Sequence, residues 1–457
     1  MGNRMNVSSL LAGDQGRPGL VWLTSEAPFR ALRDHLDGML RARAEVSSLR
    51  LTRIKFKPPR KLSAYYDVEL GNAPSTIVRP IAVTWTSRSP SSSERRPNAR
   101  RRVELAAIES GVAGPFTKLE TTDSRWNMHV RVFPFDGEFP QLVPLSNPRR
   151  ASGLAGSAEA TVVPIRYRPE QRHVLCYKTP DESGGRRPVY VKLYASDRGV
   201  WALHAARLMS RSLEKSESLG GVNPLFYDRT HRALFVPEAR GNPLSCLWSS
   251  SNVDDWTQGA GEMLNLIHCA DLSPVSACRA TDLASEAVAV WRAAAHIAAL
   301  DASLGTRIRA ILDRAVAAEK MFPPEAPRLI HGDFKADHIF VDDRRLTLID
   351  FDSCRWSDPA ADLGKFLSDM RWRDHCYGVS HYGRACELFL TGYQAREHAY
   401  RVRRARLWEA VLLAKAAARR VSVVAPDWDQ VVDHMISGAE SLLKALRAPK
   451  HRVPTEC

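Results

Sequence analysis

The chain has 457 residues, of which 44% are hydrophobic, and its formal net charge is +14. This length suits two or three domains, and the apolar content excludes a chain that is disordered throughout. No run of about 18 or more apolar residues occurs, so we expect no membrane-spanning helix. The eight cysteines form neither a C-x-x-C pair nor a His/Cys cluster with zinc spacing, which favours reduced thiols in the cytoplasm.

The positive charge raises the question of nucleic-acid binding. The basic residues are spread along the whole chain, and no DNA- or RNA-binding motif occurs. The densest cluster, SRSPSSSERRPNARRR at 87–102, is a low-complexity stretch that predicts a solvated loop. We therefore expect no nucleic-acid partner, since a phosphate-rich cofactor or an anionic substrate explains part of the charge equally well.

The first third of the chain predicts strands and one helix. IKFKPPRKLSAYY (54–66) predicts a hairpin, and RPIAVTW (79–85) predicts a third strand. A helical stretch, RRVELAAIES (101–110), and another strand, WNMHVRVFP (126–134), follow.

The middle of the chain repeats this order. Short runs rich in β-branched and aromatic residues predict strands at 161–169, 172–178, 188–194 and 233–239, with a helix at 199–213 before the last of them.

The two regions also align residue by residue. IRYRPEQRHVLCY (165–177) matches 54–66 at a constant offset of 111, and RPVYVKL (187–193) matches 79–85 at an offset of 108, so that Lys192 corresponds to Thr84. Shared strand propensity alone could produce this likeness. The common order of three strands and a helix favours a duplication.

The C-terminal half predicts helices. They cover 254–271, 283–322, 385–394, 405–424 and 428–446, with 283–322 divided into two helices near Gly305. Strands followed by helices, with one short hairpin among the helices, predict a two-lobed α+β protein.

The hairpin lies within LIHGDFKADHIFVDDRRLTLIDFDS (329–353). Strands IFV and LTLI around the turn DDRR would bring Asp333 and Asp350 close together, and close carboxylates repel unless a cation lies between them. Asp350 and the imidazole of His338 could ligate Mg²⁺ or Mn²⁺, while Asp352 would assist the metal or only accept hydrogen bonds. Asp333 would then accept a proton from a hydroxyl, a division of labour that suits phosphoryl transfer.

HGDFKADHIFV and LIDFDSCRWSDPAADLGKFL resemble the catalytic segment of the aminoglycoside phosphotransferase and choline kinase-like superfamily. Its members carry H-G-D-x-x-x-x-N, then I-D-[FWC], then D-P-x-x-D-[LI]. The resemblance covers about residues 160–440 and implies a bilobal, protein-kinase-like fold with a β-rich N-lobe and a helical C-lobe. We expect a degenerate N-lobe-like domain at 1–155, the N-lobe at 156–240 and the C-lobe at 241–450.

The resemblance implies a role for each candidate residue in the C-lobe. Asp333 would be the catalytic base, and Asp350 would be the main magnesium ligand. His331 would brace the catalytic loop by hydrogen bonding. Asp358 and Asp362 would cap the next helix and tie it to that loop.

The same resemblance implies that ATP binds the N-lobe. Lys192 would hold the α- and β-phosphates, and the backbone of Val236 and the three residues after it would meet the adenine; these three are Pro237, Glu238 and Ala239.

Three features depart from the family pattern. His338 replaces the metal-binding Asn, so Mn²⁺ would serve at least as well as Mg²⁺. The helix after Lys192 lacks a well-placed Glu, because Glu214 and Glu217 lie towards its end. The turn in YRPEQRH (167–173) has no glycine to cover the phosphates.

We therefore predict an ATP-dependent, magnesium-assisted O-phosphotransferase that acts on a hydroxyl of a small molecule. The alternative is a catalytically weak pseudokinase or nucleotide-binding scaffold, which the missing helix Glu, the His338 exchange and the duplicated lobe favour. Basic C-terminal helices favour a neutral or anionic acceptor, such as a sugar or an acidic metabolite, over a cationic aminoglycoside.

With Thr84 in place of the lysine, the first copy would dock against the N-lobe or shape substrate access. Nothing in the sequence indicates the oligomeric state.

Overall fold

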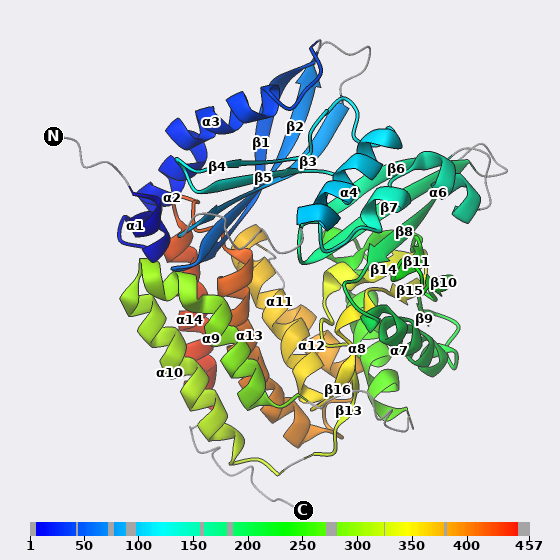
Figure 1. Ribbon diagram of the computed structural model, residues 1–457. Coiled ribbons are helices and arrows are strands. Elements are labelled where there is room, and N and C mark those ends of the chain that lie inside the picture. The colour runs from blue at the N-terminus through cyan, green and yellow to red at the C-terminus, as the bar shows by residue number, and fades with distance from the viewer. Residues whose placement is uncertain are drawn as a thin grey trace, which may run out of the picture. The chain divides into compact units, whose positions relative to one another are not determined.

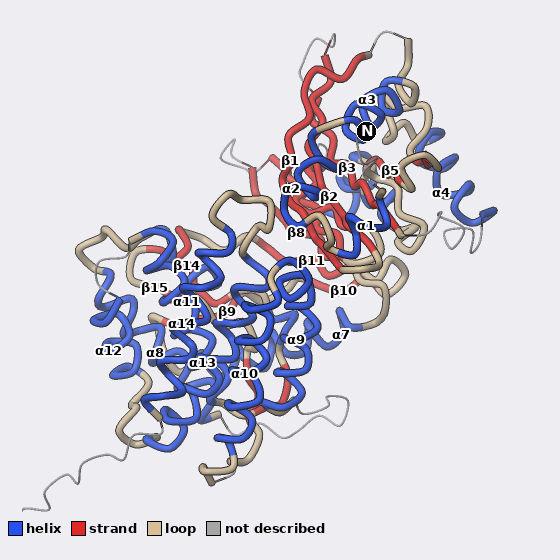
Figure 2. Tube along the Cα trace, turned by 90° about the vertical axis from the view of Figure 1, so that its left-hand side faces the viewer, coloured by secondary structure: helices blue, strands red, loops and turns tan. Residues whose placement is uncertain are grey.

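The computed structural model describes nine stretches of the chain, namely residues 6–42, 44–71, 77–87, 97–155, 160–180, 186–270, 281–323, 325–378 and 382–446. The chain forms two compact units. The first comprises Met1–His204, Asn223–Glu238 and Ser422–Val424, and the second comprises Ala205–Val222, Ala239–Val421 and Ala425–Cys457. Strands dominate the first unit and helices the second, as the colours of Figure 2 show.

The first unit begins with three helices and a five-stranded antiparallel sheet (Figure 1). The helices are α1 (Val7–Ala12), α2 (Gly16–Ser25) and α3 (Ala27–Asp37). The sheet has the order β1-β2-β3-β5-β4, with strands β1 (Glu45–Lys57), β2 (Lys61–Gly71), β3 (Ile77–Thr86), β4 (Glu120–Asp123) and β5 (Met128–Val132). Helix α4 (Pro97–Glu109) connects β3 to β4, and α5 (Leu142–Leu145) and α6 (Pro148–Ala155) follow β5.

A second five-stranded antiparallel sheet belongs to the same unit. Its order is β10-β11-β8-β7-β6, with strands β6 (Thr161–Arg168), β7 (Arg172–Pro180), β8 (Arg186–Leu193), β10 (Phe226–Asp228) and β11 (Ala233–Pro237). Helix α7 (Arg198–Leu213) follows β8. Both sheets therefore have one connectivity: a three-stranded meander, a helix, and two further strands of which the last pairs with the third.

The registers of the two sheets agree as well. Ser63 on β2 pairs with Thr84 on β3, and Val174 on β7 pairs with Lys192 on β8. Thr84 and Lys192 therefore occupy equivalent positions, as the alignment of the sequence has them. That the two regions descend from a duplication stays a prediction.

One hydrophobic core joins the two sheets. Buried side chains from the first sheet, from the segment after β5 and from the second sheet pack together, among them Tyr65, Phe139, Tyr177, Val191 and Phe235. Full burial of such a side chain contributes about 1.5–3 kcal/mol. The predicted domain at 1–155 thus shares one compact unit with most of the predicted domain at 156–240, of which residues 205–222 and 239–240 belong to the second unit.

The second unit is a helical bundle that carries short strands. Its helices are α8 (Val253–Cys269), α9 (Leu283–Leu300), α10 (Ala302–Glu319), α11 (Ala360–Tyr377), α12 (Tyr382–Gly392), α13 (Ala399–Arg420) and α14 (Trp428–Ala445). One sheet has the order β12-β14-β15-β9, with strands β9 (Leu219–Gly221), β12 (Asn242–Pro243), β14 (Ile339–Asp342) and β15 (Arg345–Leu348). Strand β13 (Arg328–Ile330) pairs with β16 (Arg355–Ser357). Short 3₁₀ helices are η1 (Leu244–Cys246), η2 (Ala336–His338) and η3 (Phe351–Ser353). The predicted α+β class is confirmed.

Two predicted features differ from the structure. The helices within 283–322 separate at Asp301 and not near Gly305, because the Asp301 carboxylate accepts a hydrogen bond from the Leu304 N–H (2.9 Å) and caps α10. Gly305 lies inside α10, where an added Cβ would be 2.6 Å from that of Ala298. The predicted loop at 87–102 is also partly wrong, because α4 begins at Pro97; residues 88–96 lie outside the described ranges.

Helix α9 alone, among the described residues, is long and apolar enough to cross a membrane, with a mean hydropathy of 1.2. It packs against α10 and α13. Its buried Glu286 accepts a hydrogen bond from Lys415 of α13 at 2.5 Å. These contacts are those of a core helix in a bundle.

Candidate active site

The loop that links β13 to β14 carries the predicted catalytic residues. Gly332 has φ +75°, and an added Cβ would lie 2.4 Å from the Ser353 carbonyl oxygen, so only glycine fits this close approach. Asp350 follows β15 with φ +65°, a left-handed conformation that is uncommon for aspartate. Such outliers cluster at functional sites, where surrounding contacts hold them in place.

Asp362 near the start of α11 holds this loop by its backbone. Its two carboxylate oxygens accept hydrogen bonds from the N–H groups of His331 (2.6 Å) and Gly332 (2.7 Å). Burial would raise the pKa of Asp362, but His268, 3.4 Å away, and the backbone donors outweigh it, so the pKa is lowered. An ionised carboxylate therefore anchors the loop to the helix.

His331 connects the loop to the end of β15. Its Nε2–H donates to the Ile349 carbonyl (2.9 Å), and its Nδ1 accepts from the Asp333 N–H (3.3 Å). The fully buried imidazole thus lies between the two segments that carry Asp333 and Asp350.

Two lysines flank the Asp333 carboxylate. Lys335 Nζ lies 2.9 Å from Oδ2, and Lys365 Nζ lies 3.4 Å from Oδ1. Burial alone would raise the pKa of Asp333, but the positive charge of Lys365, with that of Lys335, holds it well below its usual range. The sequence analysis missed both lysines. Lys365 follows Asp362 by three residues on α11, a spacing that places both on one helix face and could have drawn attention to it.

The structure also brings His338 and Asp350 together. His338 Nδ1–H donates to the Asp333 carbonyl (3.0 Å), and its Nε2 lies 3.6 Å from Asp350 Oδ2. Burial lowers the pKa of His338 to about 4, so the neutral imidazole directs a lone pair towards the carboxylate. In the described ranges no group of three His, Cys, Asp or Glu is arranged to hold a metal ion. The predicted metal role of Asp352, which lies in η3, stays a prediction.

Asp358 caps α11 and meets α13. Its Oδ1 accepts from the Ala360 N–H (2.9 Å), and the Arg404 guanidinium contacts both of its carboxylate oxygens at 2.7 and 2.9 Å. Arg404 and Arg401 also pair with Glu325. Carboxylates thus neutralise much of the basic character of α13, which removes a premise of the predicted preference for anionic acceptors.

Lys192 lies in the first unit, on β8 between Val174 of β7 and Leu234 of β11. No residue of helix α7 carries a carboxylate, and Glu214 and Glu217 both lie after its end. The helix therefore cannot supply the usual partner of such a lysine.

The predicted adenine-binding segment begins at the end of β11. Pro237 has no N–H, and the Glu238 N–H donates to the Pro188 carbonyl (3.1 Å), so neither can donate to an adenine ring in this conformation. Burial raises the pKa of Tyr190 to about 12, and its hydroxyl donates to the Glu238 carboxylate (3.2 Å). Ala239 begins the next stretch of the second unit.

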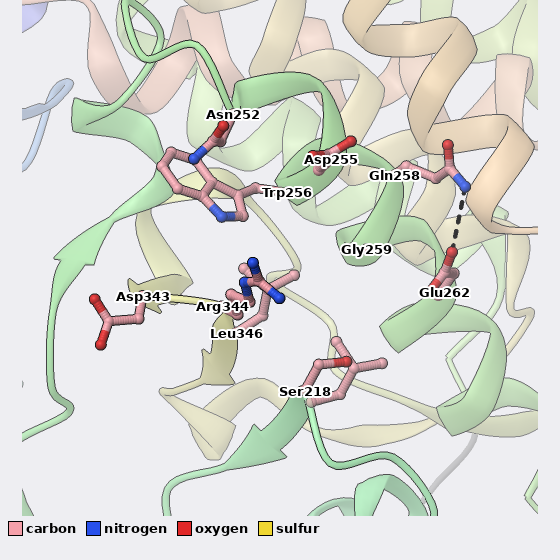
Figure 3. A pocket seen from close by; sticks show the side chains of 11 residues that line it. Ser218, Asn252, Asp255, Trp256, Gln258, Gly259, Glu262, Asp343, Arg344 and Leu346 are labelled. Atoms are coloured by element: carbon pink, nitrogen blue, oxygen red, sulfur yellow. Dashed lines mark hydrogen bonds between the residues drawn. The ribbon is translucent and has the colours of Figure 1, made fainter.

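A separate cavity of about 490 Å³ lies between α8 and the β14–β15 turn (Figure 3). Its lining includes Asp255, Trp256, Glu262, Asp343 and Arg344, and the predicted site residues are not part of it. This cavity is therefore distinct from the Asp333 site.

Comparison with known proteins finds a family match within the second unit. Residues 247–408 match the phosphotransferase enzyme family. The match confirms the predicted family resemblance and kinase-like fold class, and with them the enzyme class, a kinase of small molecules. This phosphotransferase segment contains every C-lobe candidate from His331 to Asp362, whereas Lys192 lies outside it.

Solved structures of phosphotransferases resemble this chain at low sequence identity. A choline/ethanolamine kinase family protein from Mesorhizobium loti is 13% identical, with 65% of this chain and 92% of that chain covered and a TM-score of 0.44. A thermostable mutant of an aminoglycoside phosphotransferase is 14% identical, with 65% and 98% covered and a TM-score of 0.46. Choline kinase from Cryptosporidium parvum is 11% identical, with 63% and 90% covered and a TM-score of 0.44. No curated protein matches the sequence.

Proposed function

We propose that this phosphotransferase moves the γ-phosphoryl group of ATP to a hydroxyl of a small molecule. The observation that carries the proposal is the arrangement around Asp333: a carboxylate on a loop tied to α11, with Lys335 and Lys365 beside it and Asp350 and His338 next to the same loop. Phosphoryl transfer needs these parts, namely a positioned acceptor and concentrated positive charge.

Asp333 would bind the substrate hydroxyl that attacks the phosphoryl group. Its lowered pKa makes it a weak base in this state, so its first task is to orient the hydroxyl as a hydrogen-bond acceptor. As phosphate groups attract the ammonium groups of Lys335 and Lys365, the pKa of Asp333 would rise, and the carboxylate would take the proton late in the transfer. The same ammonium groups would stabilise the negative charge of the transferred group.

Asp350 and His338 would hold a divalent cation. The fit rests on the His338 tautomer, whose Nδ1–H is engaged with the Asp333 carbonyl while Nε2 faces Asp350 Oδ2 at 3.6 Å. A bound cation of this kind neutralises phosphate charge. One carboxylate and one imidazole suit Mn²⁺ at least as well as Mg²⁺.

Transfer of labelled phosphate from ATP to a panel of hydroxylated metabolites, with Mg²⁺ or Mn²⁺, tests the proposal. We expect Asp333→Asn to lower kcat by about 10²–10⁴-fold while ATP binding persists. We expect Asp350→Ala to abolish the metal-dependent transfer of phosphate. Asp343→Asn, in the exposed turn of the same hairpin, is the matched control and should retain full activity. ATP binding without transfer to any acceptor would instead favour a nucleotide-binding scaffold.

A further inference from the structure

Three arginines share one face of the second sheet with Lys192. Arg168 pairs with Arg172, Arg166 pairs with Val174, and Val174 pairs with Lys192. Directly paired residues of antiparallel strands point to the same face. The hairpin of β6 and β7 therefore places its arginines on the sheet face that also carries the lysine predicted to hold phosphates, with β7 between β6 and that lysine's strand.

The opposite face of this hairpin is buried. Tyr167, His173 and Leu193 alternate with the basic residues, and their exposed fractions are 6%, 0% and 1%. The arginines and Lys192 are half-buried. The core thus fixes which face of the sheet presents the cations.

The positive charges on this face repel one another. Burial lowers the pKa of Arg168 to about 10, and the next contributions come from Arg53, on β1 of the first sheet, and from Arg166 on the same face. A concentration of half-buried cations is stabilised when an anion binds among them.

The equivalent face of the first sheet also carries a cluster of basic residues. Lys55, Lys57 and Lys61 occupy the positions that correspond to Arg166, Arg168 and Arg172. This correspondence follows from the register, since Lys57 pairs with Lys61 as Arg168 pairs with Arg172.

The turn between β6 and β7 inserts into that face. Glu170 lies 3.5 Å from Lys61 and 2.8 Å from Arg131, and Lys55 donates to the Gln171 side chain (2.9 Å). The Glu170 N–H also donates to Asp136 (2.8 Å). In the first sheet, therefore, a carboxylate of the protein itself occupies the basic face, and the turn that carries it is held in place.

We propose that Arg166, Arg168 and Arg172 bind the phosphate groups of the nucleotide. This inference rests on the proposed function and on the predicted role of Lys192 as a residue that holds the phosphates of ATP. Residues 161–180 contain no glycine, so side chains would supply the donors that a glycine-rich turn supplies from its backbone. Guanidinium groups bind phosphate oxygens in a bidentate manner, and the anchored turn holds them in position.

Calorimetric titration of the full chain with ATP, ADP and AMP in the presence of Mg²⁺ tests this assignment. We expect Arg168→Ala to weaken ATP binding about tenfold or more and ADP binding less, with AMP affinity and the KM for the acceptor unchanged. Arg168→Lys should recover part of the loss. The control is Arg50→Ala, an exposed β1 arginine that pairs with Asp67, and it should bind ATP like the wild type.

The outcomes separate the two proposals. A wild-type chain that binds no ATP would refute the proposed function. ATP binding that Arg168→Ala leaves unchanged would overturn the arginine assignment alone. An equal loss for AMP and ATP, or a change confined to the acceptor KM, would also overturn it, because the phosphates would then not be what Arg168 contacts.

Discussion

The two five-stranded sheets have one strand order but present different chemistry. At the position of Lys192 the first sheet has Thr84, whose hydroxyl lies 3.4 Å from that of Ser63 and accepts from Arg131 at the same distance. The first face is closed by contacts within the protein, whereas the second carries Lys192 and three arginines. We propose that one backbone arrangement serves as a support in the first sheet and as a ligand site in the second, because function depends on the side chains of the face.

The largest effect should come from separating the two sheets. Asp136 is 1% exposed and accepts from the Glu170 N–H and from His173 Nε2, both at 2.8 Å. Asp136→Ala would leave buried donors without an acceptor, and we expect a loss of about 3–5 kcal/mol in the free energy of unfolding, measured with urea. Asp67→Ala, which removes a more exposed ion pair of the first sheet, should cost about 1 kcal/mol or less. Equal losses would mean that the turn does not depend on the first sheet.

The next effect tests which sheet binds nucleotide. Lys192→Met should lower kcat/KM for ATP about 100-fold or more, because a charge that contacts phosphate is lost. Thr84→Val, at the equivalent position of the first sheet, should leave kcat/KM within about twofold of the wild type, since no ligand charge depends on it. Steady-state kinetics at varied ATP decides the matter, and comparable losses in both variants would remove the functional distinction between the sheets.

The smallest predicted effect is a loss of folding stability at acidic pH. Burial would raise the pKa of Glu120 in the first sheet, but hydrogen bonds from His129 and Arg100 outweigh it and lower the pKa to about 2. The folded pKa lies below the unfolded value, so this contribution to stability is complete above about pH 4.5 and is lost as the pH falls towards 2. The slope is at most about 1.36 kcal/mol per pH unit.

Urea unfolding at pH 6 and pH 3.5 measures this contribution. The difference in stability between the wild type and Glu120→Gln should shrink at the lower pH, whereas the difference for Glu69→Gln, on the exposed part of β2, should stay nearly constant. A wild-type advantage over Glu120→Gln that is the same at both pH values would contradict the buried charge pair.

Much of the fold was predictable from local pattern. The hairpin around 339–348 and most strands of both sheets follow from runs of β-branched and aromatic residues between turns, whereas the short strands β4 and β10 were not located. Periodicity did not locate the break between α9 and α10, because capping by Asp301 decides it and the glycine is tolerated inside the helix. Most of α4 was predicted as the helix at 101–110, but its start at Pro97 was missed because the charged, low-complexity composition there is typical of a loop.

The candidate site was predictable only in part. The order of HGD, IDF and DPAAD marked Asp333, Asp350 and Asp362, and their placement near one loop agrees with that order. Lys335 and Lys365 escaped notice because a lone lysine in a sequence is most often a solvated residue. The arginines of α13 suggested an exposed basic surface. In the structure, however, Arg404 is buried and paired with carboxylates.

The sequence by itself determined the strand periodicity and the spacing of the catalytic acids, because these depend on residues near one another along the chain. It also determined the equivalence of Thr84 and Lys192, because each lies in a local strand pattern that occurs twice. Tertiary structure alone decided that Lys365 neutralises Asp333 and that the β6–β7 turn enters the basic face of the first sheet. Such contacts join residues distant in sequence, and their energies depend on burial and on neighbouring charges that packing creates.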